Sequence, residues 1–156
     1  MDFTEQATAR SQITQVMHRY ARLARENCDW DGIAKCFEPE GIYRLPDGRA
    51  LPPGQAREVV RGKEARFIRH HLTTIDIEFV SDDEAHSQAQ FFAATEYKFA
   101  DHWGYWQDIF RKQMDGSWLI HERTIVTEGH DPAGWSAKVY GGDALKIASE
   151  KNGNVV

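Results

Sequence analysis

The stretch HHLTTIDIEFV, residues 70–80, leads two adjacent histidines into an alternating pattern of apolar and acidic side chains. From Ile75 to Phe79 every second residue is apolar, which predicts a strand with one buried face. We predict this strand over Leu72–Val80. The basic stretch before it, Arg61–Arg69, is predicted to be a helix, so the histidines are expected at the junction of the two elements.

The second half of the chain continues as strands separated by polar turns. Asp115-Gly116 is a strong hairpin signal, because both residue types accept the backbone angles of a two-residue turn. The strands predicted after Val80 are Ala85–Phe99, Trp103–Met114 and Trp118–Thr127. These segments predict a run of long antiparallel strands.

The first half is predicted to be mainly helical. Apolar residues recur every three or four positions between Ile13 and Ala24, the spacing of one face of an amphipathic helix. Ala50–Gln55 contains two prolines and a glycine and is expected to be a loop. The other elements predicted here are helices over about Thr4–Glu26 and Trp30–Phe37 and a strand over Ile42–Leu45. Three helices before antiparallel strands predict an α+β fold, with a curved, cone-shaped antiparallel or mixed sheet around a cavity that the helices close.

The composition is that of one globular domain. The 156 residues are 41% hydrophobic and 28% charged, with a formal net charge of −5. Such a chain is poorly suited to nucleic acid, because neutralising phosphates dominates that binding. It has neither the roughly 18 apolar residues of a membrane span nor the pattern of a signal peptide, so we expect a cytoplasmic protein without a membrane partner. We expect one domain over residues 1–140 and a partly disordered tail over 141–156.

No metal site is expected from the spacing of the cysteines and histidines. Cys28 and Cys36 do not have zinc-ligand spacing, and no further cysteine completes a set. In a reducing compartment they are most simply free thiols. His102, His121 and His130 are not spaced as metal ligands either.

His70 and His71 are candidate general bases, because histidine takes or gives a proton near neutral pH. A structural alternative is that one of them caps the helix C-terminus, where the helix dipole favours a cation. The phase of the strand favours His71 as the inward residue, since it lies an even number of positions from Ile75 and Ile77.

Aromatic residues concentrate in the later strands. The ones we select as candidate lining of a substrate cavity are Phe91, Trp103, Tyr105 and Trp106. Sheet packing would require the same residue types, so the pattern is consistent with both a core and an aromatic cavity.

The order of elements and several short motifs resemble the SnoaL-like branch of the nuclear transport factor 2-like superfamily. The motifs are Tyr20, Asp29-Trp30-Asp31, Phe37-Glu38-Pro39, Gly62-Lys63-Glu64, His70-His71-Leu72-Thr73-Thr74, Gly104-Tyr105, Asp115-Gly116-Ser117-Trp118 and Arg123. The resemblance extends over roughly Ile13 to Val126. The pattern is most similar to members such as scytalone dehydratase, hexachlorocyclohexane dehydrochlorinase and bile-acid dehydratase.

The resemblance implies an elimination reaction without metal or organic cofactor, acting on a hydrophobic aromatic or alicyclic ring. Counting back from the strand assigns the base to His70, with His71 as the fallback. The family's aspartate partner is absent: counting from Trp30 places Glu26 at its position, and counting from Tyr20 places Arg25 there.

Other family positions carry over less directly. Tyr20 matches a family tyrosine on the first helix. A second family tyrosine would fall at Leu45, and Tyr43, two residues earlier, is on the same face of that strand. Both tyrosines would donate hydrogen bonds to the carbonyl or leaving group. A second family histidine falls near His102 or Gly104. The family also implies a homodimer or homotrimer.

Two other functions fit the same resemblance. An epoxide hydrolase or polyketide cyclase would use carboxylates and an arginine inside the cone, for which Asp108 and Arg123 are available. A non-catalytic ligand-binding or assembly domain would have an apolar cavity without an acid–base pair. Fold alone does not choose among these, because one fold hosts many functions.

Overall fold

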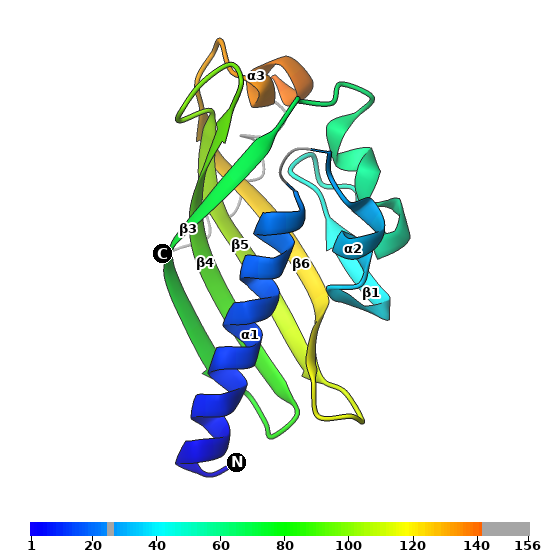
Figure 1. The fold of residues 1–156 in the computed structure, drawn as a ribbon, viewed down its shortest axis with the longest axis vertical. Helices are drawn as coiled ribbons and strands as arrows, with labels where there is room; N and C mark the ends of the chain where they lie inside the picture. The colour runs from blue at the N-terminus through cyan, green and yellow to red at the C-terminus, as the bar shows by residue number, and fades with distance from the viewer. Residues whose placement is uncertain (25–26, 142–156) are drawn as a thin grey trace.

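A six-stranded mixed sheet, crossed on one face by a long helix, forms the body of the molecule (Figure 1). The computed structural model describes residues 1–24 and 27–141. The helices are α1 (Phe3–Leu23), α2 (Trp30–Ala34), the 3-10 helix η1 (Pro53–Val60) and α3 (Trp135–Tyr140). The strands are β1 (Phe37–Arg44), β2 (Ala50–Leu51), β3 (Ile68–Phe79), β4 (Glu84–Thr95), β5 (His102–Lys112) and β6 (Trp118–His130). The α+β fold with a curved sheet is confirmed.

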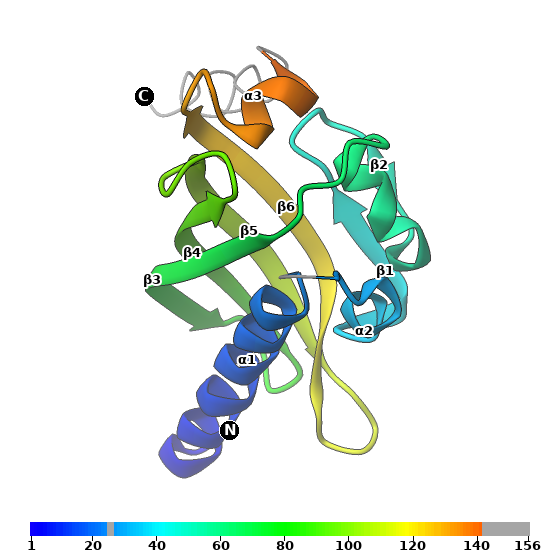
Figure 2. The same ribbon diagram turned by 45° about the horizontal axis from the view of Figure 1, so that its top comes forward.

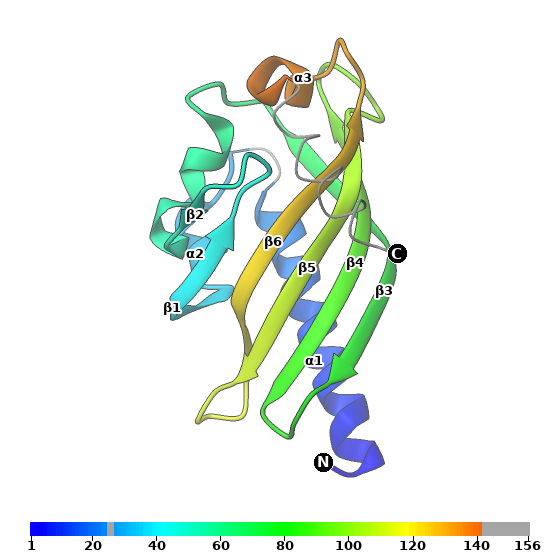
Figure 3. The ribbon, with the colours of Figure 1, turned by 180° about the vertical axis from the view of Figure 1, so that it is seen from behind.

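The strand order is β2-β1-β6-β5-β4-β3. Strands β3 to β6 pair antiparallel in sequence order, as expected for strands joined by short turns. Asp115-Gly116 forms the predicted β5–β6 turn, in which Gly116 has a φ of 83°. Strand β1 is parallel to β6, so the sheet is mixed. The side of the sheet opposite α1 is seen in Figure 3.

Helix α1 covers the concave face of the sheet (Figure 2). Asp2 accepts a hydrogen bond from the Glu5 backbone, and the Glu5 carboxylate accepts one from the Asp2 backbone, which starts the helix with a capping box. Ile13 and Met17 are fully buried against the sheet. The predicted amphipathic face is therefore the face that forms the core.

The predicted third helix, Arg61–Arg69, is wrong. Helical structure occurs earlier, in η1, where Pro53 occupies the first turn. It ends at Arg61 and Gly62, whose φ angles of 48° and 70° are left-handed. The chain is already extended from Ile68, so the histidines lie inside β3 rather than at its start.

Three other boundaries differ from the predictions. Helix α2 ends at Ala34, because Phe37 already pairs with Ile120 in the parallel β1–β6 contact. The predicted strand Ile42–Leu45 is the end of this longer strand. Helix α3, in a segment rich in glycine and proline, was not predicted; the contacts that hold it are made with residues far away in the sequence.

No helix in the described part of the chain is long and apolar enough to cross a membrane. Of the predicted tail, residues 142–156 lie outside the described part.

Candidate active site

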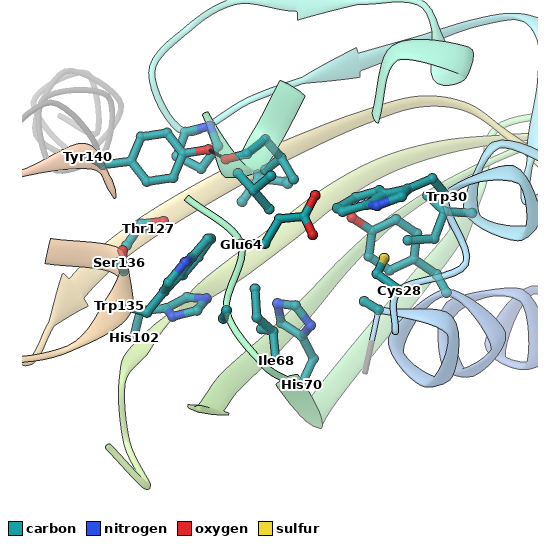
Figure 4. A pocket seen from close by; sticks show the side chains of 18 of the residues that line it. Cys28, Trp30, Glu64, Ile68, His70, His102, Thr127, Trp135, Ser136 and Tyr140 are labelled. Atoms are coloured by element: carbon teal, nitrogen blue, oxygen red, sulfur yellow. Dashed lines mark hydrogen bonds between the residues drawn. The ribbon is translucent and has the colours of Figure 1, made fainter. Parts of the chain in front are cut away.

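A cavity of about 510 Å³ opens at the end of the sheet nearest α3, between the concave face, the end of α1 and η1. Most of its wall is aliphatic or aromatic. The polar side chains of the wall include Tyr20, Tyr43, His70, His102, Thr127 and Ser136, and the charged ones are Glu64, Arg66 and Glu96. In the view of Figure 4, His102 and Trp135 lie on one side of the pocket, Cys28 and Trp30 on the other, and His70 and Glu64 between them.

A β-bulge decides which of the paired histidines faces this cavity. Leu72 pairs with Phe91, but Ile75 pairs with Ala89, so the register of β3 against β4 shifts between the two pairs. The extra residue changes the alternation by one position. His70 therefore shares the inward face with Ile75, although an unbroken strand would have given that face to His71.

His71 lies on the opposite face of the sheet. It is exposed and stacks on Phe92, with ring centroids 4.7 Å apart. The fallback base is therefore wrongly placed for the cavity, and the phase argument that favoured it fails at the bulge.

His70 is half-buried and packs among aromatic rings. Its ring centroid is 5.3 Å from that of Phe91, 5.4 Å from that of Trp106 and 5.8 Å from that of His102. Its Nδ1 is buried and has no hydrogen-bond partner among the described residues. Burial, with the nearby positive charge of Arg123 and the His102 ring adding to it, holds the pKa of His70 well below its usual range. His70 is therefore neutral at neutral pH.

His102 is oriented by a carboxylate from the preceding residue. Its Nδ1 lies 2.9 Å from Oδ1 of Asp101, and both side chains are buried. Because Nδ1 is bound to Asp101, Nε2 is the ring nitrogen left to act on a molecule in the cavity. Sequence analysis missed this pair, although it had noted a second family histidine near His102. The signal that could have found it is the Asp-His dipeptide at the start of the aromatic strand.

Asp101 is held as an anion by four hydrogen bonds. Oδ1 also accepts from the Ser136 backbone amide at 3.0 Å, and Oδ2 accepts from Thr95 Oγ1 at 2.8 Å and from the Trp135 amide at 2.5 Å. Burial alone would raise the pKa of this carboxyl, but these bonds together lower it to about 2. Asp101 thus anchors the first turn of α3 and orients His102 at the same time.

Tyr20 and Tyr43, the two candidate hydrogen-bond donors, contact each other beside the cavity. Their hydroxyls are hydrogen-bonded to each other, and both residues line the cavity. Burial raises the pKa of Tyr20 to about 12 and that of Tyr43 well above its usual value. Both phenols are therefore protonated at neutral pH and able to donate a hydrogen bond.

Asp108 and Arg123 form a second buried pair. They are register partners on β5 and β6, and the guanidinium binds the carboxylate through two contacts of 2.8 and 2.7 Å. The pair faces inward, the orientation that an epoxide hydrolase or cyclase would need. It is sealed by the rings of Tyr20 and Trp106 above Arg123, however, and neither charged residue lines the cavity.

The remaining predicted residues divide between the two faces of the sheet. Phe91 lines the cavity, and Trp106 packs against His70 beside it. Trp103 is 42% exposed, and neither it nor Tyr105 lines the cavity. The two positions alternate with the inward residues Gly104 and Trp106, so the prediction that they contact substrate there is wrong for this cavity.

Three further points concern reactive groups. Arg25 and Glu26, the alternatives for the family's aspartate position, lie outside the described residues. Burial raises the pKa of the Cys28 thiol to about 12, so this cavity residue is not a thiolate at neutral pH. Within residues 1–24 and 27–141, no three His, Cys, Asp or Glu side chains are grouped as metal ligands would be.

Comparisons with known proteins agree with this architecture. A candidate scytalone dehydratase from Novosphingobium aromaticivorans matches with a TM-score of 0.67 and 19% identity, over 85% of this chain and 95% of that one. A type 2 hexachlorocyclohexane dehydrochlorinase (LinA) matches with a TM-score of 0.72 and 11% identity, over 83% of this chain and 92% of that one. A protein of unknown function with a cystatin-like fold, from Nostoc punctiforme, matches with a TM-score of 0.67 and 19% identity, over 80% of this chain and 92% of that one. At these identities the likenesses show a shared fold.

A comparison with curated protein sequences finds no match. The model of the SnoaL-like domain, in contrast, matches residues 5–124, which include most of α1 and most of the sheet. The chain therefore belongs to the SnoaL-like domain family.

Proposed function

We propose that the protein is a cofactor-independent lyase or isomerase of the dehydratase type, which removes a proton from a hydrophobic ring substrate. The observation that carries the proposal is the Asp101–His102 pair, in which Nδ1 is bound to the carboxylate and the imidazole ring lines the cavity. A histidine positioned by an anionic carboxylate is a general base able to work near neutral pH.

His102 is the better base of the two cavity histidines. When it takes a proton, the Asp101 carboxylate stabilises the resulting imidazolium, because the anion is already bound to Nδ1. His70 has no such partner among the described residues, and its surroundings oppose a positive charge. The proposal thus keeps a histidine base but moves it from His70 to His102.

The chemistry balances without an added reactant. His102 takes a proton from a ring carbon next to a carbonyl group, and the electrons of that C–H bond form an enolate, whose negative charge lies on the carbonyl oxygen. When the carbonyl re-forms, those electrons make the new C=C bond to the carbon that carries the leaving group. The leaving oxygen departs with the electrons of its C–O bond and receives a proton from the histidinium, which releases water. The Tyr20–Tyr43 hydroxyls would hold the carbonyl oxygen on which negative charge develops.

The lining supports a hydrophobic ring as the substrate. Apolar and aromatic walls bind ring carbons, and a few polar groups fix their orientation. The neighbours described as a scytalone dehydratase and as hexachlorocyclohexane dehydrochlorinases have the same fold, which is consistent with this assignment. His70 would contact the ring from the side, as a neutral donor or acceptor.

The test is turnover of a panel of hydroxylated and halogenated ring compounds by the wild type and by His102→Gln. We expect the variant to lose about 10²–10⁴-fold in kcat, the usual contribution of a general base. His86→Gln is the matched control, because His86 is an exposed strand histidine away from the cavity.

Unchanged turnover in His102→Gln would exclude His102 as the base. Tight binding of ring compounds without turnover in the wild type would instead indicate a ligand-binding domain. His70→Phe separates the two histidines: we expect a smaller loss of kcat than in His102→Gln, and a larger one would return the base to His70.

A further inference from the structure

The buried Asp108–Arg123 pair is not used by the proposed reaction as described so far. Arg123 is 0% exposed and Asp108 3%. Removing two charges from water costs several kcal/mol for each ion, and the contact between them does not reliably repay it. One guanidinium nitrogen, Nη1, is also buried without a hydrogen-bond partner among the described residues. A group retained at this cost calls for a role beyond packing.

The position of Arg123 indicates that role. Its guanidinium carbon lies 4.2 Å from the ring centroid of Tyr20 and 3.9 Å from that of Trp106. Arg123 and Tyr43 are also register partners across β6 and β1. The fixed positive charge is therefore adjacent to both members of the hydroxyl pair that lines the cavity.

We infer that Arg123, held in place by Asp108, is a positioning residue that polarises the Tyr20–Tyr43 hydroxyl pair, so that the pair forms an oxyanion-binding site for a carbonyl oxygen of the substrate. The inference deepens the proposed function and rests on it for the identity of the bound oxygen. Its physical core, the effect of Arg123 on the two phenols, is independent of any reaction.

Electrostatics gives the direction of the effect. Burial makes a phenol a weaker acid, whereas a nearby cation stabilises negative charge on its oxygen and favours proton donation. Arg123 acts in this second direction on both tyrosines. The other ionisable groups that act on the pair are the Cys28 thiol, on Tyr20, and the Tyr140 phenol, on Tyr43; both oppose Arg123.

The arrangement is suited to a developing charge. Arg123 does not line the cavity, so a bound molecule does not form a direct ion pair with it. The charge reaches the cavity only through the hydroxyls, which are aligned before substrate arrives. Pre-aligned donors in a site shielded from water stabilise a transition-state oxyanion more than a ground-state carbonyl.

The first experiment titrates the phenols directly. The five tyrosines are replaced by 3-fluorotyrosine, and fluorine NMR follows each ring against pH, with Tyr20→Phe and Tyr43→Phe assigning the two signals. In Arg123→Met/Asp108→Leu, which removes both charges together, we expect the two midpoints to rise by about 1 pH unit. Arg44→Met is the control: it removes a guanidinium from the position after Tyr43 and should leave both midpoints in place. Unchanged midpoints in the double variant would overturn the inference.

For a second variant, we expect the titration midpoints of the two tyrosines to shift in the opposite direction. Asp108→Asn keeps the shape of the partner and leaves the Arg123 charge unopposed, so the two midpoints should fall. A rise or no change would contradict the inference even if the double variant does not fold.

Kinetics then separates this inference from the proposed function. With a substrate from the ring panel, Arg123→Met/Asp108→Leu should lower kcat and leave KM nearly unchanged, because the donors act mainly in the transition state. Arg123→Lys, which keeps the charge, should recover part of kcat. If the wild type turns over no member of the panel, the proposed function fails, while the titration still decides whether Arg123 polarises the tyrosines.

Discussion

Asp101, the residue before β5, and Asp108, in the middle of that strand, are both buried and each binds a basic side chain. The two pairs differ in the segments that pack over them. The Arg123 guanidinium lies against the rings of Tyr20 and Trp106, and neither Arg123 nor Asp108 lines the cavity that His102 faces. Asp101 is covered by the first turn of α3, and its partner His102 faces the cavity. A buried carboxylate bound to a basic side chain is thus enclosed in the core at Asp108, whereas at Asp101 the basic partner lines the cavity.

The two carboxylates also differ in the groups that they bind. Asp108 neutralises a permanent cation, so its removal leaves a charge in the core. Asp101 binds the imidazole ring of His102 and two backbone amides. We therefore expect substitutions at Asp108 to reduce stability more than activity, and substitutions at Asp101 or His102 to reduce activity more than stability.

The largest effect on stability is expected for Asp108→Leu. The variant leaves the Arg123 guanidinium buried and unpaired, which should lower the free energy of unfolding by about 3–5 kcal/mol. Chemical denaturation of the wild type and the variant measures the difference. Adding Arg123→Met should restore most of the loss; a double variant as unstable as the single one would show that packing, not the unpaired charge, is responsible.

The second prediction is a pH dependence carried by Asp101. Its pKa of about 2 in the folded protein is below the ordinary aspartate value, so folding favours the anion. This stabilisation is complete above about pH 4 and is lost as the pH falls through about 2, and it amounts to roughly 2 kcal/mol. Denaturation curves between pH 5 and pH 2 should therefore converge for the wild type and Asp101→Asn.

Other carboxylates titrate in both proteins, so only the difference between the two curves reports on Asp101. A constant difference over this range would mean that Asp101 is not the stabilising anion.

The smallest effect is expected for Gly134→Ala. A Cβ at this position would lie 2.7 Å from Oδ2 of Asp101, so α3 must move away from the carboxylate that orients His102. We expect a stability loss of about 1 kcal/mol and a roughly tenfold lower kcat. Gly54→Ala is the control, since a Cβ there meets no atom within 4 Å. Equal kcat for Gly134→Ala and the wild type would show that the position of α3 does not affect the Asp101–His102 pair.

Much of the fold followed from local sequence patterns. The amphipathic spacing in α1, the alternating strands and the Asp115-Gly116 turn are signals within a few residues, and the structure contains each of them. The failures occurred where local and distant interactions compete. Arg61–Arg69 has the composition of a surface helix, but pairing with β4 makes its end a strand. Helix α3 depends on Asp101, far earlier in the chain.

The candidate site was predictable only in part. Family resemblance led to the cavity, to His70 and to Tyr20, because these residues stand in recognisable motifs. Tyr43 came only from its place two residues before the family position at Leu45, and its contact with Tyr20 was not predicted. The bulge that turns His70 inward leaves no clear signal in the sequence, since a single extra residue reverses the alternation. Asp101 was overlooked because its role comes from the amides of α3 and from Thr95, which are brought together by folding.

Sequence alone was sufficient for the class of fold, the family and the residue types available for proton transfer, because these are encoded in periodicity, composition and short motifs. Folding determined which carboxylate orients a base and which neutralises a cation. Both outcomes depend on burial, and burial is set by the segments that cover each group: Tyr20 and Trp106 over Arg123, and α3 over Asp101.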